Sequence, residues 1–227
     1  MIAPKAALFD FVGTLVFVKT SVGLVYSEIA SAYGIFSSAE LLEMNFHKLI
    51  KEKTPPTGGE IEEKRWWKSL VAETFEMSNC NPGDKLNNIF ESVFVEFSKA
   101  TVWGIYPDVV PVFNELKRRN IKLGLVSNFD SRLEMILSEL EIINYFNCLS
   151  YSGKVGFSKP DPRIFQHALM NLNCLSEETL YIGDNLDNDY VPANDLNINA
   201  YLINRDNMTF PADINVIKTL HELTQLV

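Results

Sequence analysis

The second half of the chain, from Tyr106 onward, alternates short apolar runs with segments that carry apolar residues at helical spacing. Short apolar runs bounded by turn-forming residues are typical of buried strands. Strands that alternate with helices predict a mostly parallel sheet with helices on both faces. The expected strands are residues 121–126, 148–151, 180–182 and 200–203, and the expected helices are 109–116 with Asp108 as N-cap, 133–140 and 163–172.

An earlier apolar run, residues 6–9, ends at Asp10 and is followed by Gly13, which is typical of a buried strand that ends in a turn. Between this strand and Tyr106 the helical period recurs without a strand, which predicts an inserted helical module. The predicted fold is therefore α/β, with a doubly wound, mostly parallel sheet and a four-helix insertion. We expect a core domain of residues 1–16 and 101–227 and a helical domain of residues 17–100. The four expected helices are 25–33, 39–51, 60–75 and 86–97.

The chain of 227 residues is acidic, with 29 Asp and Glu against 20 Lys and Arg, for a net charge of −9. This balance argues against nucleic acid as a partner, because a phosphate backbone needs a basic face. Three cysteines without metal-ligand spacing argue against a disulfide framework and for a reducing compartment. The first residues lack a signal-peptide layout, and no apolar run reaches membrane-spanning length. We therefore expect a cytoplasmic protein that has no membrane partner and acts on a small molecule.

Polar side chains stand at the carboxyl ends of three predicted strands, where ligands bind in parallel sheets. These are Asp10, Ser127 with Asn128, and Asp184. A lone buried carboxylate is costly unless a cation meets it, and two candidates exist for that cation. One is Lys159, in a loop stiffened by Pro160 and Pro162. The other is a divalent metal, because several carboxylates, with Asp189 added, are the oxygen ligands that Mg²⁺ prefers.

Four short segments, taken in order, resemble the motifs of the haloacid dehalogenase-like hydrolase superfamily. They are Asp10-x-x-x-Thr14-Leu15, Ser127-Asn128, Lys159-Pro160, and Gly183-Asp184 with Asp189. The run Val126 to Leu133, together with Lys159 to Phe165 and Gly183-Asp184-Asn185, is most similar to the branch called haloacid dehalogenase-like hydrolase domain-containing protein 3. The resemblance implies a Rossmann-like core, and the helical insertion lies where that superfamily places its cap. A cap implies control of access to the site and selection of the substrate.

The resemblance implies a role for each of these residues. Asp10 would be the nucleophile and form an aspartyl intermediate, and Thr14 would orient it through a hydrogen bond. Ser127, Asn128 and Lys159 would bind the transferred group, and Lys159 would also offset the charge of Asp10.

For the metal, the resemblance implies Mg²⁺ held by Asp10, by the backbone carbonyl of Val12 and by Asp184. Asp189 would support the metal site indirectly, through a water molecule or through Lys159. The side chain of Val12 departs from the superfamily pattern. Its phosphatases usually carry a second aspartate there, which protonates the leaving oxygen and then activates water. Valine supplies neither function, so an activated leaving group such as an aryl oxygen is easier to displace than an alkyl oxygen.

Three functions stay open at this point. The first is a Mg²⁺-dependent phosphatase that acts on a small phosphorylated molecule. The second is a 2-haloacid dehalogenase, in which Asp10 displaces halide from carbon. Val12 favours it, because these dehalogenases also lack the second acid. Asp184 and the lack of any arginine before Arg65 count against it, because these enzymes usually carry a small polar residue at the first position and an early cap arginine near the halide. The third is a catalytically weak binding module. Both a monomer and a homodimer are compatible with the sequence.

Overall fold

The computed structural model describes residues 3–53, 56 and 59–227. Contacts divide the chain into two compact units, residues 1–17 with 105–227 and residues 18–104. We call the first the α/β unit and the second the helical unit. The first boundary between the units lies one residue later than expected, after residue 17, and the second lies four residues later, after residue 104. Both boundaries fall within a two-stranded sheet, which is formed by β2 (Val16–Val18) and β3 (Trp103–Ile105). The sequence analysis missed these two strands.

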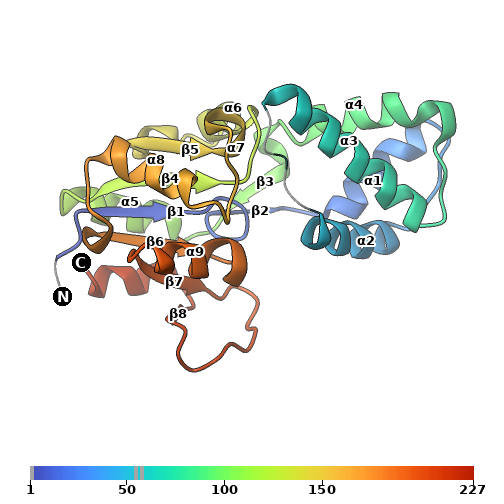
Figure 1. The fold of residues 1–227 in the computed structure, drawn as a ribbon. Helices are drawn as coiled ribbons and strands as arrows, with labels where there is room; N and C mark the ends of the chain where they lie inside the picture. The colour runs from blue at the N-terminus through green and yellow to red at the C-terminus, as the bar shows by residue number, and fades with distance from the viewer. Residues whose placement is uncertain (1–2, 54–55, 57–58) are drawn as a thin grey trace. The chain divides into compact units, whose positions relative to one another are not determined.

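The α/β unit contains a six-stranded sheet in the order β5–β4–β1–β6–β7–β8, and every neighbouring pair is parallel (Figure 1). This confirms the predicted α/β fold. Its last strand, β8, has two residues and is too short to show a periodic pattern in the sequence. The strands are β1 (Ala6–Phe9), β4 (Lys122–Ser127), β5 (Cys148–Tyr151), β6 (Thr179–Gly183), β7 (Asn199–Ile203) and β8 (Val216–Ile217).

The strand order reverses at β1, which lies between β4 and β6. From β1 the order runs outward through β4 and β5, and it resumes on the other side of β1 with β6. Such a reversal leaves a crevice beyond the carboxyl ends of the strands, where open α/β sheets bind their ligands. Asp10 follows β1, Ser127 ends β4 and Asp184 follows β6, so all three residues lie at this reversal.

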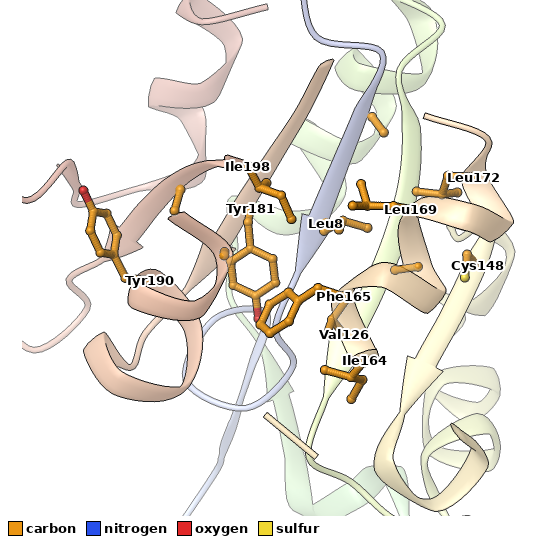
Figure 2. Packing of buried hydrophobic residues seen from close by; sticks show 14 of the residues in the cluster. Leu8, Val126, Cys148, Ile164, Phe165, Leu169, Leu172, Tyr181, Tyr190 and Ile198 are labelled. Carbon is orange, nitrogen blue, oxygen red and sulfur yellow. The ribbon is translucent and has the colours of Figure 1, made fainter. Parts of the chain in front are cut away.

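Helices pack on both faces of the sheet, as predicted. Leu8 of β1 belongs to a buried cluster with Phe165 and Tyr181, on the side covered by α8 (Figure 2). The next residue, Phe9, packs against Phe113 of α5 with 5.1 Å between ring centroids, since successive strand residues point to opposite faces. The α-helices of this unit are α5 (Val109–Arg118), α6 (Leu133–Glu139), α7 (Ser152–Val155), α8 (Pro162–Leu172) and α9 (Val191–Asp195).

The helical unit has a core of its own, rich in aromatic rings. Tyr26 and Phe75 stack with centroids 6.0 Å apart and ring planes at 11°. Serine side chains cap two of its helices: Ser21 accepts from Leu24 N and Ser38 from Leu41 N. Among the residues that the structure describes, its α-helices are α1 (Val22–Ala32), α2 (Ala39–Glu52), α3 (Glu60–Met77) and α4 (Leu86–Glu96).

One local prediction in the α/β unit needs correction. Asp108 stands at the N-cap position of α5, but its carboxylate makes no capping hydrogen bond. It accepts instead from the Arg205 guanidinium and from Leu220 N, because a charged guanidinium competes better for the carboxylate than a helix N–H does. Near the end of the described chain, a 3₁₀ helix covers Leu220–Gln225. In the part of the chain that the structure describes, no helix is both long and apolar enough to cross a membrane.

Candidate active site

Asp10 begins a tight loop at the carboxyl end of β1. Gly13 has a positive φ of 83° and donates its N–H to the Val16 carbonyl at 2.8 Å, a backbone conformation that favours glycine. Glycine is also required by space, because a Cβ at this position would lie 2.2 Å from an oxygen of Asp184. The loop therefore brings the carboxylate after β6 directly against the backbone that follows β1.

Lys159 joins two of the carboxylates. Its ammonium donates to Oδ1 of Asp10 at 2.5 Å and to Oδ1 of Asp189 at 2.6 Å, and its side chain is only 4% exposed. The backbone of Lys159 is held as well: Asn128 donates its amide to the Lys159 carbonyl at 2.9 Å and accepts from the Lys159 N–H at 2.6 Å. Binding of the transferred group by Asn128 stays a prediction: the residue lines the cavity, and its side chain also positions the backbone of Lys159.

Asp189 reaches the cluster from a π-helical turn, η5 (Leu186–Tyr190). Its Oδ1 accepts from Lys159 and also from the Tyr181 hydroxyl at 2.6 Å, and its Oδ2 accepts from Asn185 N at 3.1 Å. A Cβ at Gly183 would lie 2.3 Å from the Asp189 carboxyl carbon, so this glycine lets the carboxylate approach the end of β6.

Tyr181 was missed by the sequence analysis. The available signal was a single tyrosine within the apolar run of β6, because a buried phenol needs a hydrogen-bond partner. Its ring is fully buried, and burial together with the charges of Asp189 and Asp10 raises its pKa well above the ordinary value. The phenol therefore remains protonated and donates its hydrogen to Asp189.

The donor set suits a hard divalent cation. Carboxylate oxygens of Asp10, Asp184 and Asp189 lie within 4.8 Å of one another, and Mg²⁺ and Ca²⁺ prefer oxygen ligands of this kind. Asp10 and Asp189 are buried, whereas the Asp184 side chain reaches solvent. Since Asp189 already accepts three hydrogen bonds, Asp10 and Asp184 have more capacity left for a metal.

Burial and like charges raise the basicity of these carboxylates. Burial, opposed by Lys159 and assisted by Asp189, raises the pKa of Asp10 to about 6. Crowding by protein atoms and the charges of Asp10 and Asp189 raise the pKa of Asp184 well above its usual value, although its side chain reaches solvent. Burial lowers the pKa of Lys159, but the charges of Asp10 and Asp189 outweigh it and keep the pKa above the ordinary value. One lysine cannot offset three carboxylates, so a divalent cation would relieve the excess negative charge.

A cavity of about 170 Å³ opens next to this cluster, lined entirely by residues of the α/β unit. Ser127, at the end of β4, and Val12, whose side chain is 38% exposed, both line it. Thr14 does not behave as predicted. Its hydroxyl is buried without a hydrogen-bond partner among the described residues, so no hydrogen bond from it orients Asp10 here.

Arg205 is a second residue that the sequence analysis missed. Its guanidinium donates to the Thr14 carbonyl at 2.8 Å and to both oxygens of Asp108, at 2.8 and 3.1 Å, and it stacks on the Tyr106 ring at 3.9 Å. It therefore holds the loop after β1 through the Thr14 carbonyl. A lone arginine in the segment after β7 carries no pattern that would have revealed this.

The chain is similar to known proteins over most of its length. The chain is 29% identical over 225 residues to haloacid dehalogenase-like hydrolase domain-containing protein 3 of Danio rerio, covering 95% of this chain and 93% of that protein. It is 31% identical over 218 residues to the rhythmically expressed gene 2 protein of Drosophila melanogaster, covering 89% and 84%. Among solved structures, YfnB from Bacillus subtilis bound to magnesium superposes with a TM-score of 0.80 at 16% identity, covering 99% and 98%.

A family model covers the larger part of the chain. The model described as haloacid dehalogenase-like hydrolase matches residues 4–196. This range includes all four motifs and every carboxylate of the cluster. With a parallel sheet that reverses at β1 and a lysine shared by carboxylates at its edge, the chain belongs to the haloacid dehalogenase-like hydrolase family.

Proposed function

We propose that this chain is a Mg²⁺-dependent phosphatase that acts on small phosphorylated molecules and forms an aspartyl phosphate on Asp10. The observation that carries the proposal is the grouping of Asp10, Asp184 and Asp189 within 4.8 Å. A haloacid substrate carries its own carboxylate, which Asp184 would repel at this position. A phosphoryl group is accommodated there only if cations offset its charge.

Asp10 would attack phosphorus with one carboxylate oxygen, forming a P–O bond while the bond to the leaving oxygen breaks. Lys159 lies 2.5 Å from Asp10 and would offset the charge of the nucleophile and of the transferred group. Ser127 lines the cavity and would donate its hydroxyl hydrogen to a phosphoryl oxygen. When bound, Mg²⁺ would supply further positive charge to the transferred group. Water would then hydrolyse the aspartyl phosphate and regenerate Asp10.

Val12 limits the range of leaving groups. It lines the cavity but has no proton to give, so the leaving oxygen departs with the bonding electron pair as an anion. Leaving groups that are weak bases, such as aryl or acyl oxygens, depart more readily in this way than alkyl oxygens do. We therefore propose activated phosphate esters or anhydrides as the substrate class. Selection among them would depend on the helical unit, as expected for a cap.

The test measures phosphate release by the full chain from a series of aryl and alkyl phosphates, with Mg²⁺ and with a chelator. We expect release that needs Mg²⁺, increases with the acidity of the leaving group, and is lost in Asp10→Asn. Asp187→Asn is the matched control, because Asp187 is an exposed carboxylate of the same segment outside the cluster. Chelator-insensitive halide release from 2-haloacids would overturn the proposal in favour of a dehalogenase, for which Val12 is the favouring observation.

Val12→Asp gives the sharper measurement. A restored acid is expected to raise the rate with alkyl phosphates by about 10²–10⁴-fold and to change the rate with aryl phosphates much less. The rates across the series should then depend less steeply on leaving-group acidity. An equal change for all leaving groups would show that proton supply does not limit the reaction.

A further inference from the structure

We propose that Tyr181 is a positioning residue whose phenol keeps the Lys159 ammonium shared between Asp10 and Asp189. The inference deepens the proposed function, because it rests on Lys159 serving both Asp10 and the transferred group. Tyr181 itself does not line the cavity, so it would act only through Asp189 and Lys159.

The contacts form a short chain from the core to the nucleophile. The Tyr181 hydroxyl donates to Oδ1 of Asp189 at 2.6 Å, and the Lys159 ammonium donates to the same oxygen at 2.6 Å. The ammonium also donates to Oδ1 of Asp10 at 2.5 Å, and it lies 3.4 Å from the phenol oxygen. One carboxylate oxygen of Asp189 therefore serves two donors, and one ammonium serves two carboxylates.

These carboxylates compete for a single ammonium. Asp189 and Asp10 are 1% and 6% exposed, so little solvent screens the competition and each hydrogen bond has a large influence. Donation by the phenol satisfies part of the charge on Asp189 and weakens its attraction for Lys159. Without the phenol, Asp189 would hold the ammonium more tightly and draw it away from Asp10. Asp10 would then face the transferred group with less compensating charge.

Core packing fixes the phenol in place. The Tyr181 ring is fully buried and meets Phe165 at 5.1 Å between centroids, with ring planes at 63° (Figure 2). Removal of the hydroxyl alone, as phenylalanine, keeps this ring in its pocket. The same cluster offers a matched control in Tyr190, which is 7% exposed and whose hydroxyl accepts from Asn215 N at 3.2 Å, away from the cluster of carboxylates.

The experiment compares Tyr181→Phe with Tyr190→Phe in three measurements on the full chain. They are kcat and KM with an aryl phosphate, calorimetric affinity for Mg²⁺ and then for inorganic phosphate, and crystal structures without metal. For Tyr181→Phe we expect kcat to fall by about tenfold. Losses of this size are typical when a residue that orients a site residue through a hydrogen bond is removed. Phosphate affinity is expected to fall with it, whereas Mg²⁺ affinity stays equal or rises because Lys159 offsets less of the charge on Asp10. The crystal structure should show Lys159 Nζ closer to Asp189 and farther from Asp10.

The outcomes separate this inference from the proposed function. Equal loss of Mg²⁺ affinity and kcat, or the same changes in Tyr190→Phe, would mean that the phenol only stabilises the fold and would overturn the inference. An unmoved Lys159 ammonium in Tyr181→Phe would overturn it as well. If the unmodified protein neither binds nor releases phosphate, the proposed function fails, and the position of Lys159 in the metal-free crystals still decides the role of Tyr181.

Discussion

One buried cluster in each unit shows a contrast in chemistry. At the edge of its sheet the α/β unit encloses an ammonium and two carboxylates, Lys159, Asp10 and Asp189, each no more than 6% exposed. The core of the helical unit is built from stacked and edge-on rings such as Tyr26 and Phe75. Buried charges stabilise a fold weakly at best, because desolvation costs about as much as their attraction returns, whereas buried rings stabilise it strongly.

The contrast separates residues that serve chemistry from residues that serve folding. A charge cluster retained at a strand-end crevice is explained better by function than by stability, since apolar residues would stabilise the same site equally well. The ring cluster of the helical unit needs no such explanation. Variants of the two clusters should therefore differ in how their stability responds to pH, and this difference can be measured.

The largest effect is expected for Lys159→Met. It leaves Asp10 and Asp189 buried without their cation, which costs about 3–5 kcal/mol of unfolding free energy and abolishes activity. Because protonation of Asp10 relieves part of the repulsion, the loss should be smaller at pH 5 than at pH 7 in urea denaturation. Lys154→Met, which removes an exposed lysine paired with Glu134, should cost no more than about 1 kcal/mol. Equal losses for both variants would contradict the contrast.

In the helical unit, Phe75→Ala should cost about 3–5 kcal/mol, because it removes a fully buried ring and leaves a cavity. The loss should be the same at pH 5 and pH 7, since no charge is involved. Phe36→Ala is the control: Phe36 is 80% exposed, and its loss should stay within about 0.5 kcal/mol. A pH-dependent loss for Phe75→Ala would break the comparison between the units.

A smaller effect is expected in the unmodified protein without divalent metal. The pKa of Asp10 in the folded state, about 6, lies above its ordinary value of 3.8, so the folded protein binds more protons than the unfolded one between these values. Its stability should therefore decrease as the pH rises from 4 to about 6, and Mg²⁺ should restore it at pH 7. Asp10→Asn should flatten this decrease in denaturation curves, whereas Asp187→Asn should not. An unchanged slope in Asp10→Asn would show that other groups cause it.

The smallest effect concerns a neutral hydrogen bond in the helical unit. Ser78 accepts from the Asn45 amide at 3.0 Å and donates to the Thr74 carbonyl at 2.7 Å, and all three residues are buried. Ser78→Ala should cost about 1 kcal/mol, independent of pH, when measured by thermal or urea unfolding. A cost that grew with pH would indicate that a charged group is coupled to this hydrogen bond and would reduce the difference between the two clusters.

Periodicity was sufficient to predict the sheet and most helices, because long regular elements carry their pattern in the sequence. It failed where an element is too short to show a pattern, or where a residue distant in the sequence determines the hydrogen bonds of a side chain. The two residues of β8 and the paired strands β2 and β3 are of the first kind. Asp108 is of the second kind, since its carboxylate turns to Arg205, 97 residues away, rather than capping its own helix.

The candidate site divides in the same way. The motifs identified the side chains that the structure groups at the strand ends, Asp10, Lys159, Asp184 and Asp189. They gave no sign that Asn128 binds the backbone of Lys159 or that Tyr181 supports Asp189. Those contacts depend on register and side-chain direction across different strands, and a one-dimensional pattern does not contain this information.

The place of β1 in the sheet has a consequence for how the protein is made. Its strand partners start at Lys122 and Thr179, and the arginine that anchors its loop is residue 205. A ribosome adding about 5–20 residues per second needs roughly 10–40 seconds after Asp10 to supply them all. Residues 22–97, which supply the core of the helical unit, emerge well before this. Strand β1 is thus an apolar strand without its partners until they are made, and such an unpaired edge is a reason for a chaperone to shield it.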